Sequence, residues 1–102
     1  MSNETFGDYI RKAREEKNLP LRKVAAHLDI DTSTLSKVER GDRPASTDYL
    51  QPLADILKLD LKEVQTKFIA DKIGKDFGGM EHLTDGLKAA EKQIKKTKNN
   101  VI

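Results

Sequence analysis

Apolar residues recur at intervals of three and four along most of the chain, which is the spacing of one face of an α-helix. Strict alternation of apolar and polar residues, the pattern of a half-buried strand, is almost absent. The pattern predicts five short helices that begin near residues 5, 21, 32, 46 and 61. We therefore expect an all-α domain built around one modest core.

The expected core consists of the residues that fall on the inner face of each predicted helix. These are Phe6, Tyr9, Ile10 and Ala13; Leu21, Val24, Ala25 and Leu28; Leu35 and Val38; Tyr49, Leu50, Leu53, Ala54, Ile56 and Leu57; and Val64, Phe68, Ile69, Ile73 and Phe77. One apolar stripe on each helix is what amphipathic helices need to pack into a small domain.

Several residues mark the expected ends of these helices. Thr5 is a good N-cap, Pro20 suits a helix start because no hydrogen bond needs its missing N–H there, and Gly41 is typical of a helix end. Asp29 lies in the turn after the second helix and can take a left-handed backbone conformation. Pro52 lies deeper in the fourth helix than proline prefers, which predicts an irregular start.

The second and third predicted helices, within residues 21–40, are joined by a tight turn. Such a pair fits either an ordinary helical hairpin or a DNA-binding helix-turn-helix. The outward positions of the third helix carry short hydroxyls and cations and no acid: Thr32, Ser33, Ser36, Lys37 and Arg40. These side chains can donate hydrogen bonds to base edges and phosphates without repelling a polyanion. Periodicity and composition alone leave both interpretations open.

The residues of this segment also resemble a known family. The run Ala25…Leu28-Asp29-Ile30…Ser33-Thr34-Leu35-Ser36-Lys37-Val38-Glu39-Arg40-Gly41 is similar to the phage repressor and Cro-type helix-turn-helix regulators, the XRE family. The resemblance extends from about Ile10 to Val64. It implies a five-helix lambda-repressor-like DNA-binding domain whose third helix, residues 32–40, enters the major groove. It also implies a homodimer on an inverted-repeat operator of double-stranded DNA.

The resemblance assigns roles to individual positions. The implied base contacts are Thr32, Ser33 and Lys37, and Ser36 can contact either a base or a phosphate. The implied phosphate contacts are Arg40 and Arg43, Arg22 or Lys23 can take over the phosphate contact that Leu21 cannot make, and Arg14 with Glu39 is the implied structural ion pair. Two positions depart from the family pattern. Leu21 replaces a polar residue that braces the reading helix, and Asp29 replaces the usual turn glycine. We therefore expect weaker non-specific DNA affinity than in a typical member.

Charge and composition limit these interpretations further. The net charge is +2, but residues 1–60 hold 10 basic against 11 acidic residues and residues 61–102 hold 9 against 6. Overall basicity therefore does not support DNA binding; only the placement of charges does. The chain has no cysteine, as expected in a reducing compartment, and no apolar run of membrane-spanning length. We expect a cytoplasmic protein without membrane attachment.

Residues that could carry catalysis or bind a metal are isolated. His27 and His82 lie in different segments without further ligands, so we expect no metal site. Gly78-Gly79 follows no predicted strand, and Ser33 and Ser36 have no base at catalytic spacing. We expect neither an enzyme nor a cofactor.

The segment after the expected domain of residues 1–77 has its own pattern. In residues 78–102, a glycine pair precedes apolar residues at alternating spacings of three and four: Met80, Leu83, Leu87, Ala90 and Ile94. This heptad pattern predicts an additional C-terminal amphipathic helix after a hinge. An isolated helix of this length is marginal in water, so its stripe needs a partner. The stripe can pair with its twin in a homodimer, fold back onto its own domain, or bind another protein.

The sequence thus favours a sequence-specific transcriptional regulator, such as a repressor, that acts on an operator as a homodimer. Controllers of restriction–modification operons, regulators of toxin–antitoxin operons and phage switches share this domain, and the sequence does not separate them. The alternative is a protein–protein interaction module that keeps the fold and works through its C-terminal helix. The slightly acidic first 60 residues and Leu21 favour that alternative.

Overall fold

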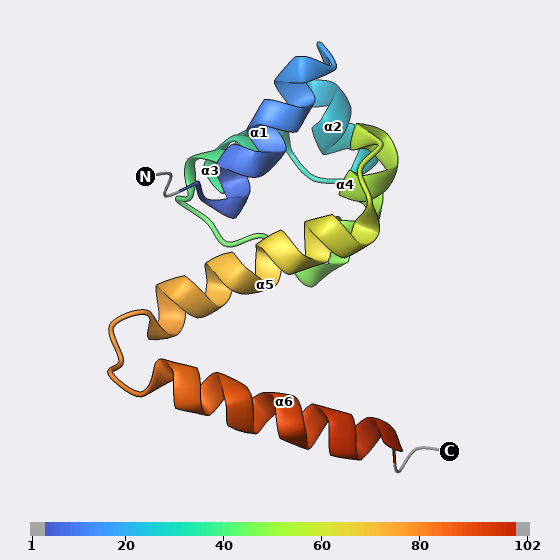
Figure 1. Ribbon diagram of the computed structural model, residues 1–102. Coiled ribbons are helices and arrows are strands. Elements are labelled where there is room, and N and C mark those ends of the chain that lie inside the picture. Colours follow the sequence, from blue (N-terminus) through green and yellow to red (C-terminus); the bar gives the residue numbers. More distant parts are fainter. Residues whose placement is uncertain (1–3, 100–102) are drawn as a thin grey trace. The chain divides into compact units, whose positions relative to one another are not determined.

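A computed structural model describes residues 4–99, with side chains through residue 97, and these residues form helices and no strand (Figure 1). The elements are α1 (Phe6–Glu16), α2 (Leu21–His27), α3 (Thr32–Arg40), the 3₁₀ turn η1 (Thr47–Tyr49), α4 (Leu50–Leu57), α5 (Leu61–Phe77) and α6 (Leu83–Asn99). The expected all-α class, five helices followed by an additional C-terminal helix, is confirmed.

The chain divides after Asp71 into two compact units. The first contains α1 to α4 and most of α5, and the second contains the end of α5 and α6. The predicted boundary at residue 77 coincides with the end of α5, whereas the division between the units falls inside that helix. The outermost residues of both predicted domains, 1–3 and 100–102, lie outside the described residues.

Local sequence explains where α1 begins. Thr5 and Asp8 form a reciprocal capping box: the Asp8 N–H donates to Thr5 Oγ1 over 3.0 Å, and the Thr5 N–H donates to Asp8 Oδ2 over 3.2 Å. The pKa of Asp8 lies below its ordinary value, chiefly because the Thr5 backbone N–H donates to the carboxylate. The N-cap expected from the sequence is therefore present.

Local sequence also explains the end of α3 and the start of α4. Gly41 closes α3 with φ of 81°, and its N–H donates to the Val38 carbonyl over 3.1 Å. Ser46 caps η1, which leads directly into α4, so Pro52 falls within the first turn of α4. The N–H groups of a first turn have no intrahelical acceptor, so the missing N–H of Pro52 costs little there. The irregular start predicted from Pro52 is this 3₁₀ turn.

The core of the first unit contains the expected apolar stripes. Its buried residues are Phe6, Ile10, Ala13, Val24, Ala25, Leu28, Leu35, Leu50, Leu53, Ala54, Leu57 and Val64. The expectation for Ile69 was wrong, because this residue is 53% exposed. Phe68 packs against the core, and the next helical residue points about 100° away. Phe77, at the end of α5 in the second unit, is also exposed rather than buried.

The first helix lies directly against the end of α3 (Figure 1). A Cβ atom added to the buried Gly7 would stand 2.5 Å from the Val38 carbonyl oxygen and closer still to that of Glu39. Only a residue without a side chain allows this approach. Gly7 therefore fixes how closely α1 supports α3.

The second unit presents the predicted heptad stripe on α6. The Gly78 N–H donates to the Gly74 carbonyl over 2.9 Å, so the helical bonding of α5 continues to Gly78 before the connection to α6. Along α6 and just before it, Met80, Leu87 and Ile94 are 62%, 42% and 58% exposed. These three apolar side chains of the stripe are thus largely exposed. Among the described residues, no helix is both long enough and apolar enough to cross a bilayer.

Candidate nucleic-acid interface

The turn between α2 and α3 holds the two helices at a fixed angle. Asp29 takes a left-handed conformation with φ of 59°, as expected from the sequence. The Ile30 N–H then donates to the Ala25 carbonyl over 3.0 Å, which closes the turn. Val24 and Leu35 are fully buried beneath it, one from each helix. The orientation of α3 is therefore set by backbone hydrogen bonds and by core packing together.

An ion pair fastens α3 to α1 from the inside. Arg14 Nε donates to Glu39 Oε2 over 2.7 Å, and Arg14 Nη2 donates to Glu39 Oε1 over 3.0 Å. The two side chains are only 13% and 5% exposed, and a third bond runs from Arg14 Nη1 to the Leu19 carbonyl. The Glu39 hydrogen bond raises the pKa of Arg14. The pair implied by the family resemblance is present, and it removes the one acid of α3 from the outer surface.

The outer surface of α3 carries the five residues expected there. Thr32, Ser33, Lys37 and Arg40 are exposed and Ser36 is half-buried. Residues four apart lie above one another on a helix, so Thr32, Ser36 and Arg40 form one row and Ser33 and Lys37 form a second. The structure thus brings the predicted base-contact residues together on one helical face.

One acid at the end of α3 was missed by the sequence reasoning. Arg40 Nε donates to Asp42 Oδ2 over 3.1 Å, and Arg40 Nη1 donates to Ser36 Oγ over 3.1 Å. The four-residue spacing of Ser36 and Arg40 could have indicated the second bond. The bond to Asp42 depends on the turn at Gly41, which brings the carboxylate back toward the helix.

The other predicted phosphate contacts come from outside α3. Arg22 and Lys23 are exposed on α2, and Arg43 is exposed in the loop that follows α3. Within the described residues, none of these three side chains takes part in a hydrogen bond or ion pair, so their charges are available to a polyanion. Leu21 packs against the core instead of taking a polar role at the surface.

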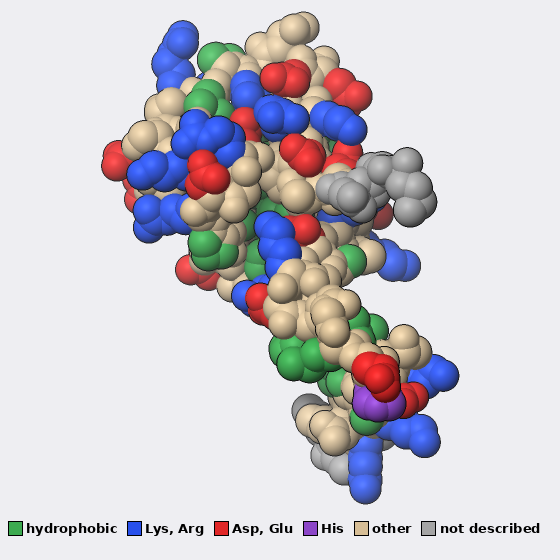
Figure 2. Space-filling view, turned by 90° about the vertical axis from the view of Figure 1, so that its left-hand side faces the viewer, with side chains coloured by type: hydrophobic (Ala, Val, Ile, Leu, Met, Phe, Trp, Pro, Cys, Tyr) green, Lys and Arg blue, Asp and Glu red, His purple; other side chains and the backbone are tan. Residues whose placement is uncertain are grey.

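Acidic side chains accompany this basic set. Asp29 and Asp31 are exposed in the turn before α3. In the view of Figure 2, Lys and Arg side chains lie beside Asp and Glu side chains and do not form a separate field. Acids beside the cations would repel a polyanion, and the weaker non-specific affinity expected from the sequence stays a prediction.

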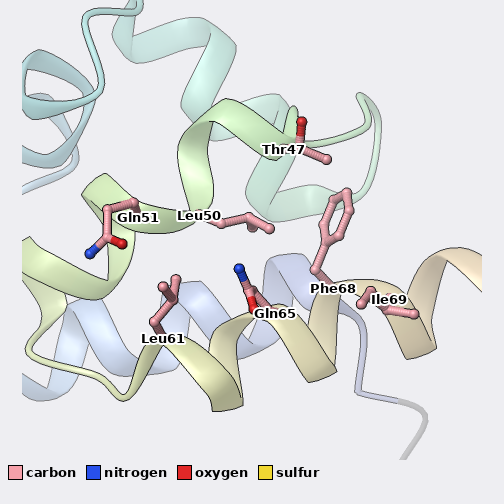
Figure 3. A pocket seen from close by; sticks show the side chains of 7 residues that line it. All are labelled: Thr47, Leu50, Gln51, Leu61, Gln65, Phe68 and Ile69. Atoms are coloured by element: carbon pink, nitrogen blue, oxygen red, sulfur yellow. The ribbon is translucent and has the colours of Figure 1, made fainter. Parts of the chain in front are cut away.

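Other possible sites lie apart from the predicted DNA-contact residues. A groove of about 400 Å³ separates η1 and α4 from α5 and is lined by Thr47, Leu50, Gln51, Leu61, Gln65, Phe68 and Ile69 (Figure 3). No predicted site residue lines it. In the part of the chain that the structure describes, no group of His, Cys, Asp or Glu side chains could hold a metal ion.

Comparison with known proteins agrees with this geometry. The helix-turn-helix family HTH_3 matches residues 10–64, which include α2, α3 and the Arg14–Glu39 pair. No protein of curated function matches the chain. The crystal structure of the clp gene regulator ClgR from Corynebacterium glutamicum is similar, with a TM-score of 0.56 and 21% identity over 90% of this chain and 84% of that one. At this identity the likeness shows the fold. Because the family model matches more than half of this chain, the chain belongs to the helix-turn-helix family of DNA-binding transcriptional regulators.

Proposed function

We propose that the protein is a sequence-specific regulator that binds an operator in double-stranded DNA as a homodimer, with α3 in the major groove. The observation that carries this proposal is the outer face of α3. Its five outward side chains include no acid, and Glu39 is held inside by Arg14. A helix with only hydroxyls and cations outward fits the acceptor-rich major groove and its phosphates.

Different residues of the interface take different roles in this proposal. Thr32, Ser33 and Lys37 lie where the reading helix meets base edges, and Lys37 can donate to guanine O6 and N7. Ser36 continues the row from Thr32 toward the DNA backbone. Phosphates are bound by Arg22 and Lys23 from α2 and by Arg40 and Arg43 from the end of α3 and its loop.

The second copy is supported by the apolar stripe on α6. Met80, Leu87 and Ile94 are exposed, while Leu83 is half-buried and Ala90 completes the spacing. Exposed apolar residues in a continuous stripe gain most when a matching surface covers them. A twin helix supplies that surface, and a two-fold dimer presents two reading helices to an inverted repeat. A dimer that covers its operator in the cytoplasm would act as a repressor.

The other candidate function is a protein-interaction module that works through α6. The specific observations that favour it are the exposed acids Asp29 and Asp31 beside α3 and the core position of Leu21. In that case α6 would bind another protein, and α3 would not contribute to DNA binding.

Selection from a library of random-sequence duplexes by the full-length protein separates the two candidates. The regulator enriches an inverted repeat whose half-sites lie about 34 Å apart, one turn of DNA. The control is Lys37→Ala, which keeps the fold because Lys37 is exposed and lacks side-chain partners. Enrichment of no sequence at low salt would contradict the regulator and favour the module.

A further inference from the structure

We infer that Asp42 is a positioning residue for DNA binding: it holds the Arg40 guanidinium against the Ser36 hydroxyl, so that Ser36 and Arg40 meet one backbone phosphate as a preformed pair. The inference rests on the proposed function and deepens it. It names what the last turn of α3 recognises, namely the anionic oxygens of the DNA backbone.

Two hydrogen bonds fix the arginine. Asp42 Oδ2 accepts from Arg40 Nε over 3.1 Å, and Ser36 Oγ accepts from Arg40 Nη1 over 3.1 Å. The guanidinium is planar, so bonds to two of its nitrogens define both its position and its tilt. A free arginine would lose rotamer freedom when it binds a phosphate, and this one has lost much of it beforehand.

The donors left over point to an anion. A guanidinium has five N–H groups, and two of them are used here, so three remain for a ligand. Because Ser36 Oγ accepts from Arg40, its own O–H hydrogen is directed elsewhere and can donate to the same ligand. A phosphate oxygen accepts from both kinds of donor, and charge-assisted bonds of this type are short and strong.

The place of the pair on α3 favours phosphate over a base. The N-terminal residues of a reading helix contact base edges, and Thr32 and Ser33 occupy that end. Arg40 is the last residue of α3, and Ser36 lies one turn before it on the same row, whereas Lys37 lies on the other row with Ser33. The pair therefore belongs to the end of the helix that leaves the groove toward the backbone.

Asp42 has two opposite effects, which makes the inference testable. Its negative charge repels the phosphate, while its carboxylate oxygen accepts the hydrogen bond that holds Arg40. Asp42→Asn removes the charge and keeps an oxygen that can accept from Arg40 Nε. Asp42→Ala removes both. If Asp42 only repelled DNA, the two variants would gain affinity equally. If it positions Arg40, Asp42→Asn binds more tightly than Asp42→Ala.

The experiment measures binding of the full chain to a mixed-sequence duplex of about 30 base pairs over a range of salt, since a phosphate contact needs no operator. We expect Arg40→Ala to weaken binding about tenfold and to lower the salt slope by about one contact. Ser36→Ala and Arg40→Ala should be non-additive by at least about twofold. Asp42→Asn should bind about two to five times more tightly than Asp42→Ala.

The controls separate positioning from folding and from general charge. Arg40 and Asp42 are exposed, so their variants should have the same melting temperature as the wild type. Glu16→Gln removes an exposed charge from α1 and should change binding less than Asp42→Asn does. Additive effects of Ser36 and Arg40, or Asp42→Ala binding as tightly as Asp42→Asn, would overturn the inference while the proposed function stands. Absence of duplex binding by the wild type would overturn both.

Discussion

The Tyr9 hydroxyl donates a hydrogen bond of 2.6 Å to the Glu63 carboxylate, which joins α1 to α5 across 54 positions of the chain. Lys67 Nζ stands 5.5 Å from the centre of the Tyr9 ring, and Phe6 meets Phe68 edge to face with 5.4 Å between ring centres. These contacts fasten to α5 the same helix that supports α3. Through these contacts α1 connects the reading helix α3 to α5.

The first prediction concerns alkaline pH. Burial, followed by the bond to Glu63, raises the pKa of Tyr9 above its ordinary value of 10.0. The unfolded chain therefore loses this proton first, and the contribution of Tyr9 to stability is present below pH 10 and declines above it. Denaturant unfolding at about pH 9 and about pH 11 should show a smaller loss of stability in Tyr9→Phe than in the wild type. Equal losses in both proteins would contradict the prediction.

The second prediction concerns the ion pair beneath α3. Glu39→Ala leaves Arg14, whose side chain is only 13% exposed, without its anion and should cost about 3–5 kcal/mol of unfolding free energy, measured by denaturant or thermal melting. The matched control is Arg11→Ala, which breaks the more exposed pair with Asp8, whose side chains are 42% and 34% exposed, and should cost less than about 1 kcal/mol. If Glu39→Ala and Arg11→Ala have the same melting temperature, the Arg14–Glu39 pair contributes no more to stability than a surface contact.

The third prediction concerns the approach of α1 to α3. Gly7→Ala places a methyl group against the carbonyls of Val38 and Glu39 and should destabilise the fold by about 1–3 kcal/mol or more. Gly74→Ala is the control, because a Cβ there meets nothing within 4 Å and the site lies inside α5. Alanine favours a helix over glycine by about 1 kcal/mol, so Gly74→Ala should be neutral or stabilising. Similar melting curves for the two variants would contradict the close packing.

The fourth prediction separates base contacts from phosphate contacts. Lys37→Ala should relax preference at one base pair of a selected operator by about 1–3 kcal/mol. Arg43→Ala should weaken binding to all sequences about equally and lower the salt slope by about one. Both side chains are exposed, so each effect should appear without a change in melting temperature. Binding measured against the operator and its single-base variants checks this. The reverse assignment would show that α3 enters DNA in another register.

The fifth prediction tests the second copy. Leu87 lies on the α6 stripe, whereas Ala89 is exposed two residues further along, about 200° around the helix. Leu87→Asp should weaken dimerisation at least about tenfold, since each burial of a leucine contributes about 1.5–3 kcal/mol and a dimer contains two. Ala89→Asp adds the same charge and should leave the dimer intact. Sedimentation over a range of concentrations measures both. Equal effects would mean that the stripe is not the dimer surface.

The helices and most of the core could be predicted from the order of residues alone. Apolar spacing placed α1 to α4, and Thr5, Pro20 and Gly41 marked helix ends, because capping and backbone preference act within a few residues of the chain. The outer face of α3 was readable for the same reason, since helical geometry alone decides which side chains share a face.

Features that depend on residues distant in sequence appear only in the folded chain. The burial of Glu39 requires Arg14 from another helix, and the need for glycine at residue 7 appears only when α3 lies against it. Ile69 belongs to an apolar pattern, yet it is exposed because α5 turns a single stripe toward the core. Asp42 reaches Arg40 only because Gly41 reverses the chain. Side-chain type and spacing define the surface that each helix offers, but the neighbouring helix decides which part of it stays in water.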